Sequence, residues 1–122
     1  MELRKRLPHK RMTTIKIKPL SVNACWQGKR FKTQAYKNYE LEALAKIPRI
    51  KLPEPPYELR MIIGVSSSLF DIDNALKPWI DILQKRLGFN DRYIYELHVK
   101  KEIVKKGEEF IKFNILHLDV PS

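Results

Sequence analysis

Apolar residues recur along this chain with two different periods, and the periods predict its secondary structure. Alternating apolar positions predict β-strands at residues 13–18, 57–66, 93–104 and 110–118, because successive side chains of a strand point to opposite faces. Apolar positions three and four residues apart predict a helix at about residues 34–47 and another that ends at Leu87. Thr33 is a suitable N-cap for the first helix, and Gly88 is a suitable terminator for the second.

Four strands and two helices that do not strictly alternate predict an α+β domain with a mixed, largely antiparallel four-stranded sheet. A length of 122 residues suits a single small domain with a modest core. We expect residues 1–12 to form a basic N-terminal arm and residues 13–122 to form the folded domain. A turn at residues 105–108 is expected to return the chain into the last strand.

One residue conflicts with a regular start of the second helix. If Asp73 is the N-cap, Pro78 falls inside the helix and removes one hydrogen bond. The conflict is smaller if the regular helix starts nearer Ala75. In either case we expect an irregular first turn beside the acidic residues described below.

The net charge of the chain indicates what kind of molecule it binds. The chain has 24 Lys and Arg against 14 Asp and Glu, a net charge of +10, and no acid lies between Leu3 and Tyr39. Such a balance favours a polyanion, more often nucleic acid than a membrane surface. The basic cluster at residues 4–11 is better explained as a solvated arm than as a binding segment.

Other features exclude several classes of protein. Cys25 is the single cysteine, so we expect no intrachain disulfide and a reducing, cytoplasmic compartment. No apolar run approaches the length of a membrane span, and the start of the chain lacks the apolar core of a secretory signal. The sequence has no Gly-rich phosphate loop, so we expect no organic cofactor.

The segment Asp71-Ile72-Asp73-Asn74 places two carboxylates two residues apart, between an expected strand and an expected helix. On an extended chain, residues i and i+2 face the same way, so both carboxylates can meet one cation. Mg²⁺ and Mn²⁺ prefer such hard oxygen ligands, and the cation also relieves the repulsion between the two acids. A metal bound here can hold a phosphate and activate a water molecule.

Three further residues extend this candidate site. Lys77 follows Asp73 at helical spacing and can contact the reacting phosphate, and Asp81 follows at the same spacing. Asp81 is better explained as a partner that holds Lys77 than as a metal ligand. Asp91 is either a turn residue or a third metal ligand; it can return to the helix start only if the strand after it lies beside the strand before Asp71.

The order of these motifs resembles the RusA-type Holliday junction resolvases. Asp71-Ile72-Asp73-Asn74-x-x-Lys77-x-x-x-Asp81, followed by Gly88-Phe89-Asn90-Asp91, is similar to the signature of that family. Pro19-Leu20-Ser21-Val22-Asn23 and the segment from Gly28-Lys29-Arg30 to Tyr36 resemble its first loop and its basic loop with the first helix. The resemblance covers about residues 13–118.

The resemblance implies a small homodimeric α+β endonuclease. Such an enzyme cuts four-way DNA junctions with Mg²⁺, or Mn²⁺ in its place, by paired nicks in recombination and repair. It implies that Asp71, Asp73 and Asp91 converge on the metal and that Lys77 is the catalytic lysine. The remaining alternative is a non-catalytic DNA-binding module whose acids are caps and turns. Residues expected to contact DNA are Lys29, Arg30, Lys32, Asn74 and Arg92.

Overall fold

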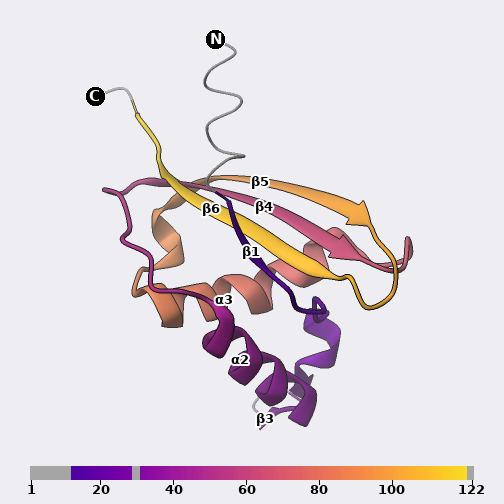
Figure 1. Cartoon of the computed structure of the whole chain (residues 1–122). Helices are drawn as coiled ribbons and strands as arrows, with labels where there is room; N and C mark the ends of the chain where they lie inside the picture. Colours follow the sequence, from indigo (N-terminus) through magenta and orange to yellow (C-terminus); the bar gives the residue numbers. More distant parts are fainter. Residues whose placement is uncertain (1–11, 29–30, 121–122) are drawn as a thin grey trace.

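The computed structural model describes residues 12–28 and 31–120 of the chain, and it has two layers, a sheet and a pair of helices (Figure 1). The larger sheet holds β1 (Thr13–Ile15), β4 (Tyr57–Val65), β5 (Ile94–Ile103) and β6 (Phe110–His117). The helices are α2 (Gln34–Lys46) and α3 (Leu76–Leu87). Shorter elements are the 3₁₀ turns η1 (Val22–Ala24), η2 (Ile72–Ala75) and η3 (Asp91–Tyr93) and the strands β2 (Trp26–Gln27) and β3 (Phe31–Lys32).

The strand order in the larger sheet is β1-β6-β4-β5. β6 is antiparallel to both β1 and β4, whereas β5 runs parallel to β4 from the pair Tyr57–Ile94 to the pair Val65–Ile103. Two parallel neighbouring strands need a crossover connection. α3, which lies between β4 and β5 in the chain, provides it by running back along one face of the sheet (Figure 1). The sheet is therefore mixed, as expected from the sequence.

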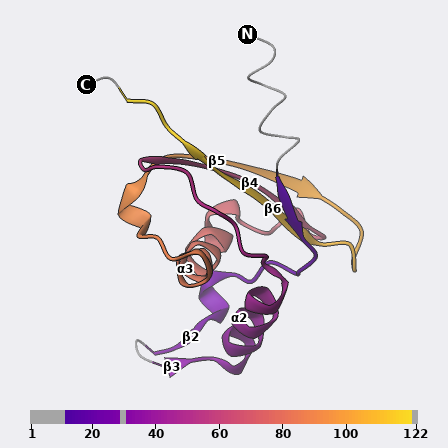
Figure 2. The ribbon, with the colours of Figure 1, turned by 60° about the vertical axis from the view of Figure 1, so that its left-hand side comes forward.

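Both helices pack on the same face of the sheet, and in the described part of the chain the other face carries no helix (Figures 1 and 2). The inward positions of β4 alternate as the sequence pattern predicts, and Leu59, Met61 and Ile63 are almost fully buried. Trp79 of α3 is completely buried and lies edge-to-face with Phe113 of β6, with ring centroids 6.2 Å apart. This core fixes α3 beneath β4 and β6.

Local sequence signals place the helix ends correctly. The Thr33 side chain accepts a hydrogen bond from the Tyr36 N–H, which caps α2. Gly88 ends α3 with φ of 77°, a conformation that glycine adopts readily. α3 starts at Leu76 with Ala75 as its N-cap, so Pro78 lies in the first helical turn, where a missing N–H costs little. The irregular turn expected before it is η2.

Two features of the fold differ from the sequence reading. The region of the basic loop suggested by the resemblance is not only loop, because η1 and the antiparallel β2–β3 pair lie between Ser21 and Lys32. The expected turn is present, with Gly107 at φ of 93°, but β6 returns on the far side of β4 and does not pair with β5. β5 is therefore an edge strand of the sheet. Among the described residues, no helix is long and apolar enough to cross a membrane.

Candidate functional site

Asp71 and Asp73 lie at the turn that connects β4 to α3, and both are exposed. Asp71 has an extended backbone, with φ of −82° and ψ of 127°, and Asp73 lies within η2. The Asn74 N–H donates to the Asp71 carbonyl at 3.1 Å, which closes the turn. The premise of an extended chain through both acids is wrong, because the chain curls into a 3₁₀ turn after Asp71.

The loop before Asp71 is held by a lysine from the neighbouring strand. Lys101 of β5 donates from Nζ to the carbonyl oxygens of Ser68, at 3.0 Å, and Phe70, at 2.8 Å. This lysine was missed in the sequence analysis, although it interrupts the apolar positions Leu97, Val99 and Ile103 of β5. A charged residue at a strand position where the alternation predicts an apolar side chain indicates such an anchoring role.

Lys77 projects from the first turn of α3 and is mostly exposed. Its ammonium lies 3.0 Å from Oδ1 of Asp81, an i,i+4 pair along the helix. The same Asp81 oxygen accepts from Nε2 of Gln84 at 3.4 Å. Asp81 therefore holds the lysine, as the sequence analysis expected.

Asp91 lies at the opposite end of α3 from Asp71 and Asp73. Its N–H donates to Oε1 of Gln84 at 2.9 Å, close to the end of the helix. A helix of 12 residues is about 18 Å long, so the acids that precede it and the acid that follows it are far apart. Among the described residues, these three aspartates do not form a group of carboxylates close enough to share an ion.

The prediction that Asp91 returns to Asp71 and Asp73 within one chain is therefore wrong, and the reason is strand direction. The strand after Asp91 does lie beside the strand before Asp71, as required. The two strands are parallel, however, so the start of β5 lies beside the start of β4 and away from its end. The condition that the two strands are adjacent is met, but their parallel direction was not considered in the sequence analysis.

The residues expected to contact DNA are distributed over the molecule. Lys29 and Arg30 lie outside the described residues. Asn74 is half-buried in η2, beside the acids. Arg92 is exposed next to Asp91, where its guanidinium stacks on the Tyr93 ring at 5.0 Å and donates to the Tyr93 hydroxyl at 3.1 Å. Of these residues, Asn74 is near the acidic pair, and Arg92 shares the distant end of α3 with Asp91.

Lys32 is held in an ion triad rather than free on the surface. Its ammonium lies 3.1 Å from Glu40 of α2, and Lys85 of α3 lies 2.7 Å from the same carboxylate. Partial burial of Glu40 favours the neutral acid, but the hydrogen bonds from Lys85 and Lys32 outweigh burial and lower the pKa of Glu40. The hydrogen bond to Glu40 in turn raises the pKa of Lys85. The triad ties β3, α2 and α3 together.

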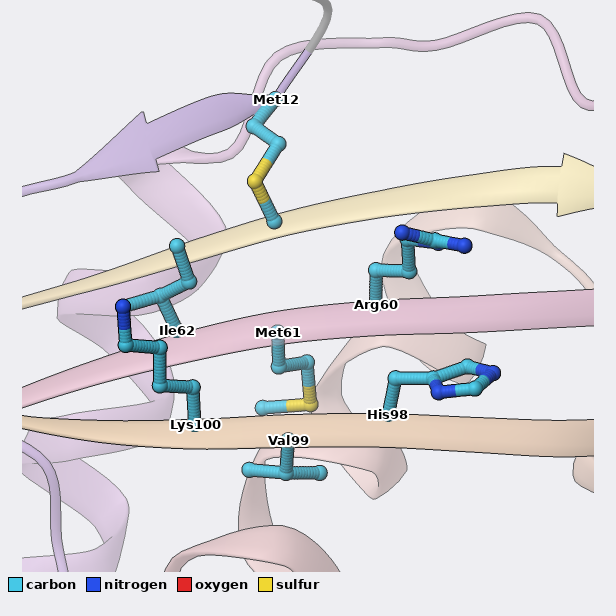
Figure 3. Close-up of a pocket in the computed structure, with 7 residues that line it drawn as sticks. All are labelled: Met12, Arg60, Met61, Ile62, His98, Val99 and Lys100. Carbon is cyan, nitrogen blue, oxygen red and sulfur yellow. The ribbon is translucent and has the colours of Figure 1, made fainter. Parts of the chain in front are cut away.

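A second charged cluster lies on the face of the sheet opposite the helices. Glu58 and Glu96 are cross-strand neighbours, and His98 lies 3.3 Å from Glu58 and 3.2 Å from Glu96. Glu58 also accepts from the Arg60 guanidinium at 2.6 Å, so its charge already has a basic partner. Next to it is a shallow cavity of about 150 Å³, shown in Figure 3, whose labelled lining residues include Met12, Arg60 and Lys100. None of the aspartates of the candidate site lines this cavity.

No family model matches the chain, and no curated protein matches its sequence.

The ion triad gives a test of stability and its dependence on pH. We predict that Glu40→Gln lowers the free energy of unfolding at pH 7 by about 1 to 2 kcal/mol, because two charge-assisted hydrogen bonds are weakened. The folded-state pKa of Glu40 is below its ordinary value of 4.5, so this stabilisation is present above pH 4.5 and disappears as the pH falls through the folded-state pKa. Urea denaturation of both proteins at pH 7 and pH 3 measures the difference.

Glu42→Gln is the matched control. Glu42 pairs with Lys46 at 2.7 Å on the same helix, but both side chains are nearly half exposed, so its loss should cost less than about 0.5 kcal/mol. Equal effects of the two substitutions, or an effect of Glu40→Gln that persists unchanged at pH 3, would contradict the proposed role of the triad.

Proposed function

We propose that this chain is a metal-dependent endonuclease that resolves four-way DNA junctions by paired phosphodiester hydrolysis. The observation that carries the proposal is the exposed pair Asp71 and Asp73 at the turn into α3, with the ammonium of Lys77 on the next helical turn. This acidic site belongs to a chain of net charge +10. A protein that only binds phosphates has no need of carboxylates on its surface, because they repel the DNA backbone.

The chemistry of the donor set fits a hard divalent cation. Asp71 and Asp73 offer oxygen ligands, and Mg²⁺ is commonly held by one or two protein carboxylates with water completing its coordination. A bound Mg²⁺ or Mn²⁺ supplies Lewis-acid activation of water and neutralises charge on the phosphate. Lys77 contributes a fixed positive charge for the developing negative charge, and Asp81 keeps this ammonium oriented along α3.

In this proposal the protein is a homodimer, and each active site takes its third aspartate from the second chain. β5 is an edge strand of 10 residues without proline, and it exposes Tyr95, Leu97 and Ile103 to 61, 41 and 56%. Such a strand readily pairs with a second copy of itself. Two-fold symmetry makes the pairing antiparallel, so the start of one β5 lies beside the end of the other.

One register of this pairing is chemically favourable. Centring the two-fold axis on His98 sets Glu96 opposite Lys100 and Leu97 opposite Val99 of the second copy, which pairs opposite charges and apolar side chains. In that register, Asp91 lies at the end of the sheet where the second copy carries Lys101 and the loop to Asp71. The distant acid of one chain thus joins the acidic pair of the other. Two such sites in one dimer match the two nicks of a junction.

The direct test is nicking of a synthetic four-way junction. We predict cleavage with Mg²⁺ and none with EDTA, and we predict that Asp73→Asn abolishes cleavage while junction binding is retained, since basic residues supply most of the affinity. Asp119→Asn, which removes a fully exposed carboxylate near the C-terminus, is the control and should leave cleavage unchanged. Binding without cleavage by the wild-type protein would favour the non-catalytic DNA-binding module instead.

Lys77 is tested by its effect on rate. Lys77→Ala should slow cleavage by roughly 10² to 10³-fold, as expected for loss of one electrostatic contact in the transition state. Thermal stability and junction affinity should change little, because the Lys77 side chain is 66% exposed. A rate per folded molecule equal to that of the wild type would exclude a catalytic role.

The shared site is tested with mixed dimers. Asp73→Asn and Asp91→Asn should each be inactive alone, whereas co-refolding the two variants should restore one nick per junction. A mixed dimer then holds one site with all three aspartates, because the intact pair and the intact Asp91 come from different chains. If each chain built its own site, no mixed dimer would contain an intact one. The control for subunit exchange is the double variant, which carries both substitutions in one chain, mixed with the wild type. If the sites are shared, a mixed dimer of these two chains contains no intact site.

A further inference from the structure

The β2–β3 hairpin carries two exposed aromatic side chains that the proposed chemistry does not use. Trp26 of β2 is 41% exposed, and Phe31 of β3 is 71% exposed. Trp26 pairs with Lys32 and Gln27 pairs with Phe31, so Trp26 and Phe31 belong to opposite faces of the pair. Figure 2 places the hairpin at the side of the molecule away from the larger sheet, next to α2.

The hairpin is rigidly mounted. The Trp26 ring packs edge-on against buried Tyr36 of α2, with centroids 5.7 Å apart. At its base, the Thr33 N–H donates to the Cys25 carbonyl at 2.9 Å, and the Thr33 hydroxyl donates to the Ala24 carbonyl at 2.6 Å. Lys32 is fixed by Glu40 in the ion triad. Phe31 is therefore presented to solvent from a scaffold held on both sides.

The hairpin also begins beside the acidic pair. η1 lies directly before it in the chain, separated by buried Cys25, and packs against both η2 and α3. η2 is the turn that contains Asp73. On the other side, the Asp81 carboxylate that holds Lys77 is close enough to Tyr36 to reinforce the effect of burial, and together they raise the pKa of Tyr36 to about 12. The aromatic hairpin and the proposed reacting groups thus share one region of the molecule.

We propose that this hairpin is a stacking platform for a base whose face is exposed at the branch point of the DNA, with Phe31 as the contacting ring. An exposed aromatic ring on a rigid support is a usual means of binding bases whose faces are free. Residues 4–38 contain no acid in the sequence, and the carboxylate next to the hairpin, Glu40, is paired with Lys32 and Lys85. The inference rests on the proposed function and specifies how that site selects branched DNA, because continuous duplex offers no free base face.

Equilibrium binding without cleavage tests this platform. Wild-type and variant proteins are titrated by fluorescence anisotropy in EDTA against three probes: a four-way junction, an oligo-dT strand and a continuous duplex. Phe31→Ala should weaken binding to the junction and to the strand about ten-fold, with duplex affinity unchanged. Phe31→Leu, which remains apolar but cannot stack, should behave like alanine, and Phe31→Trp should bind like the wild type.

Leu41→Ala is the matched control. Leu41 is an apolar side chain on α2 with 69% exposure, almost the same as that of Phe31, and its loss should leave all three affinities unchanged. Unaltered junction binding by Phe31→Ala, or an equal loss on duplex, would overturn the proposal. Sedimentation of Phe31→Ala without DNA is the last measurement: a shift from dimer to monomer would assign the ring to subunit contact and also overturn it.

These outcomes are separable from those of the proposed function. A protein that shows the Phe31 effect in EDTA but never cuts DNA in Mg²⁺ retains the stacking platform and loses the nuclease assignment. A protein that cuts junctions, and whose Phe31→Ala variant binds them with wild-type affinity, retains the nuclease assignment and loses the platform.

Discussion

The parallel pairing of β4 with β5 is the constraint on which the rest of this structure depends. It requires the chain to cross the length of the sheet between the two strands, and α3 makes that crossing while burying Trp79 in the core. The acids before α3 are thereby placed at one end of the sheet and the acid after it at the other. It also leaves β5 at the edge of the sheet, where, among the described residues, β4 is its one strand neighbour.

Most of the local structure was predictable because its causes are local. Thr33, Gly88 and Pro78 each act on the backbone within one turn of their own position, and the helix ends lie where these residues place them. The alternation along β4 predicts its buried face for the same reason. The class of fold follows from the number and order of such segments.

The arrangement of the site was only partly predictable because it depends on contacts distant in sequence. The pair Lys77–Asp81 is set by helical spacing and was anticipated. The separation of Asp91 from Asp73 depends on strand direction, which the alternation of apolar residues does not encode, since it is the same for parallel and antiparallel neighbours. The involvement of Lys32 with Glu40 and Lys85 likewise joins three elements, and no short sequence window contains it.

Lys101 donates two hydrogen bonds that connect the edge strand β5 to the loop before Asp71. The stability of that strand and the conformation of that loop therefore depend on each other. The hydrogen bonds run from β5 to the carbonyls of Ser68 and Phe70, just before Asp71. Edge strands are among the first parts of a domain to fray, and segments joined by such contacts open as one cooperative unit. Fraying at the end of β5 therefore frees the loop that carries Asp71, and any contact that protects this edge from fraying also restricts the conformations open to that acid.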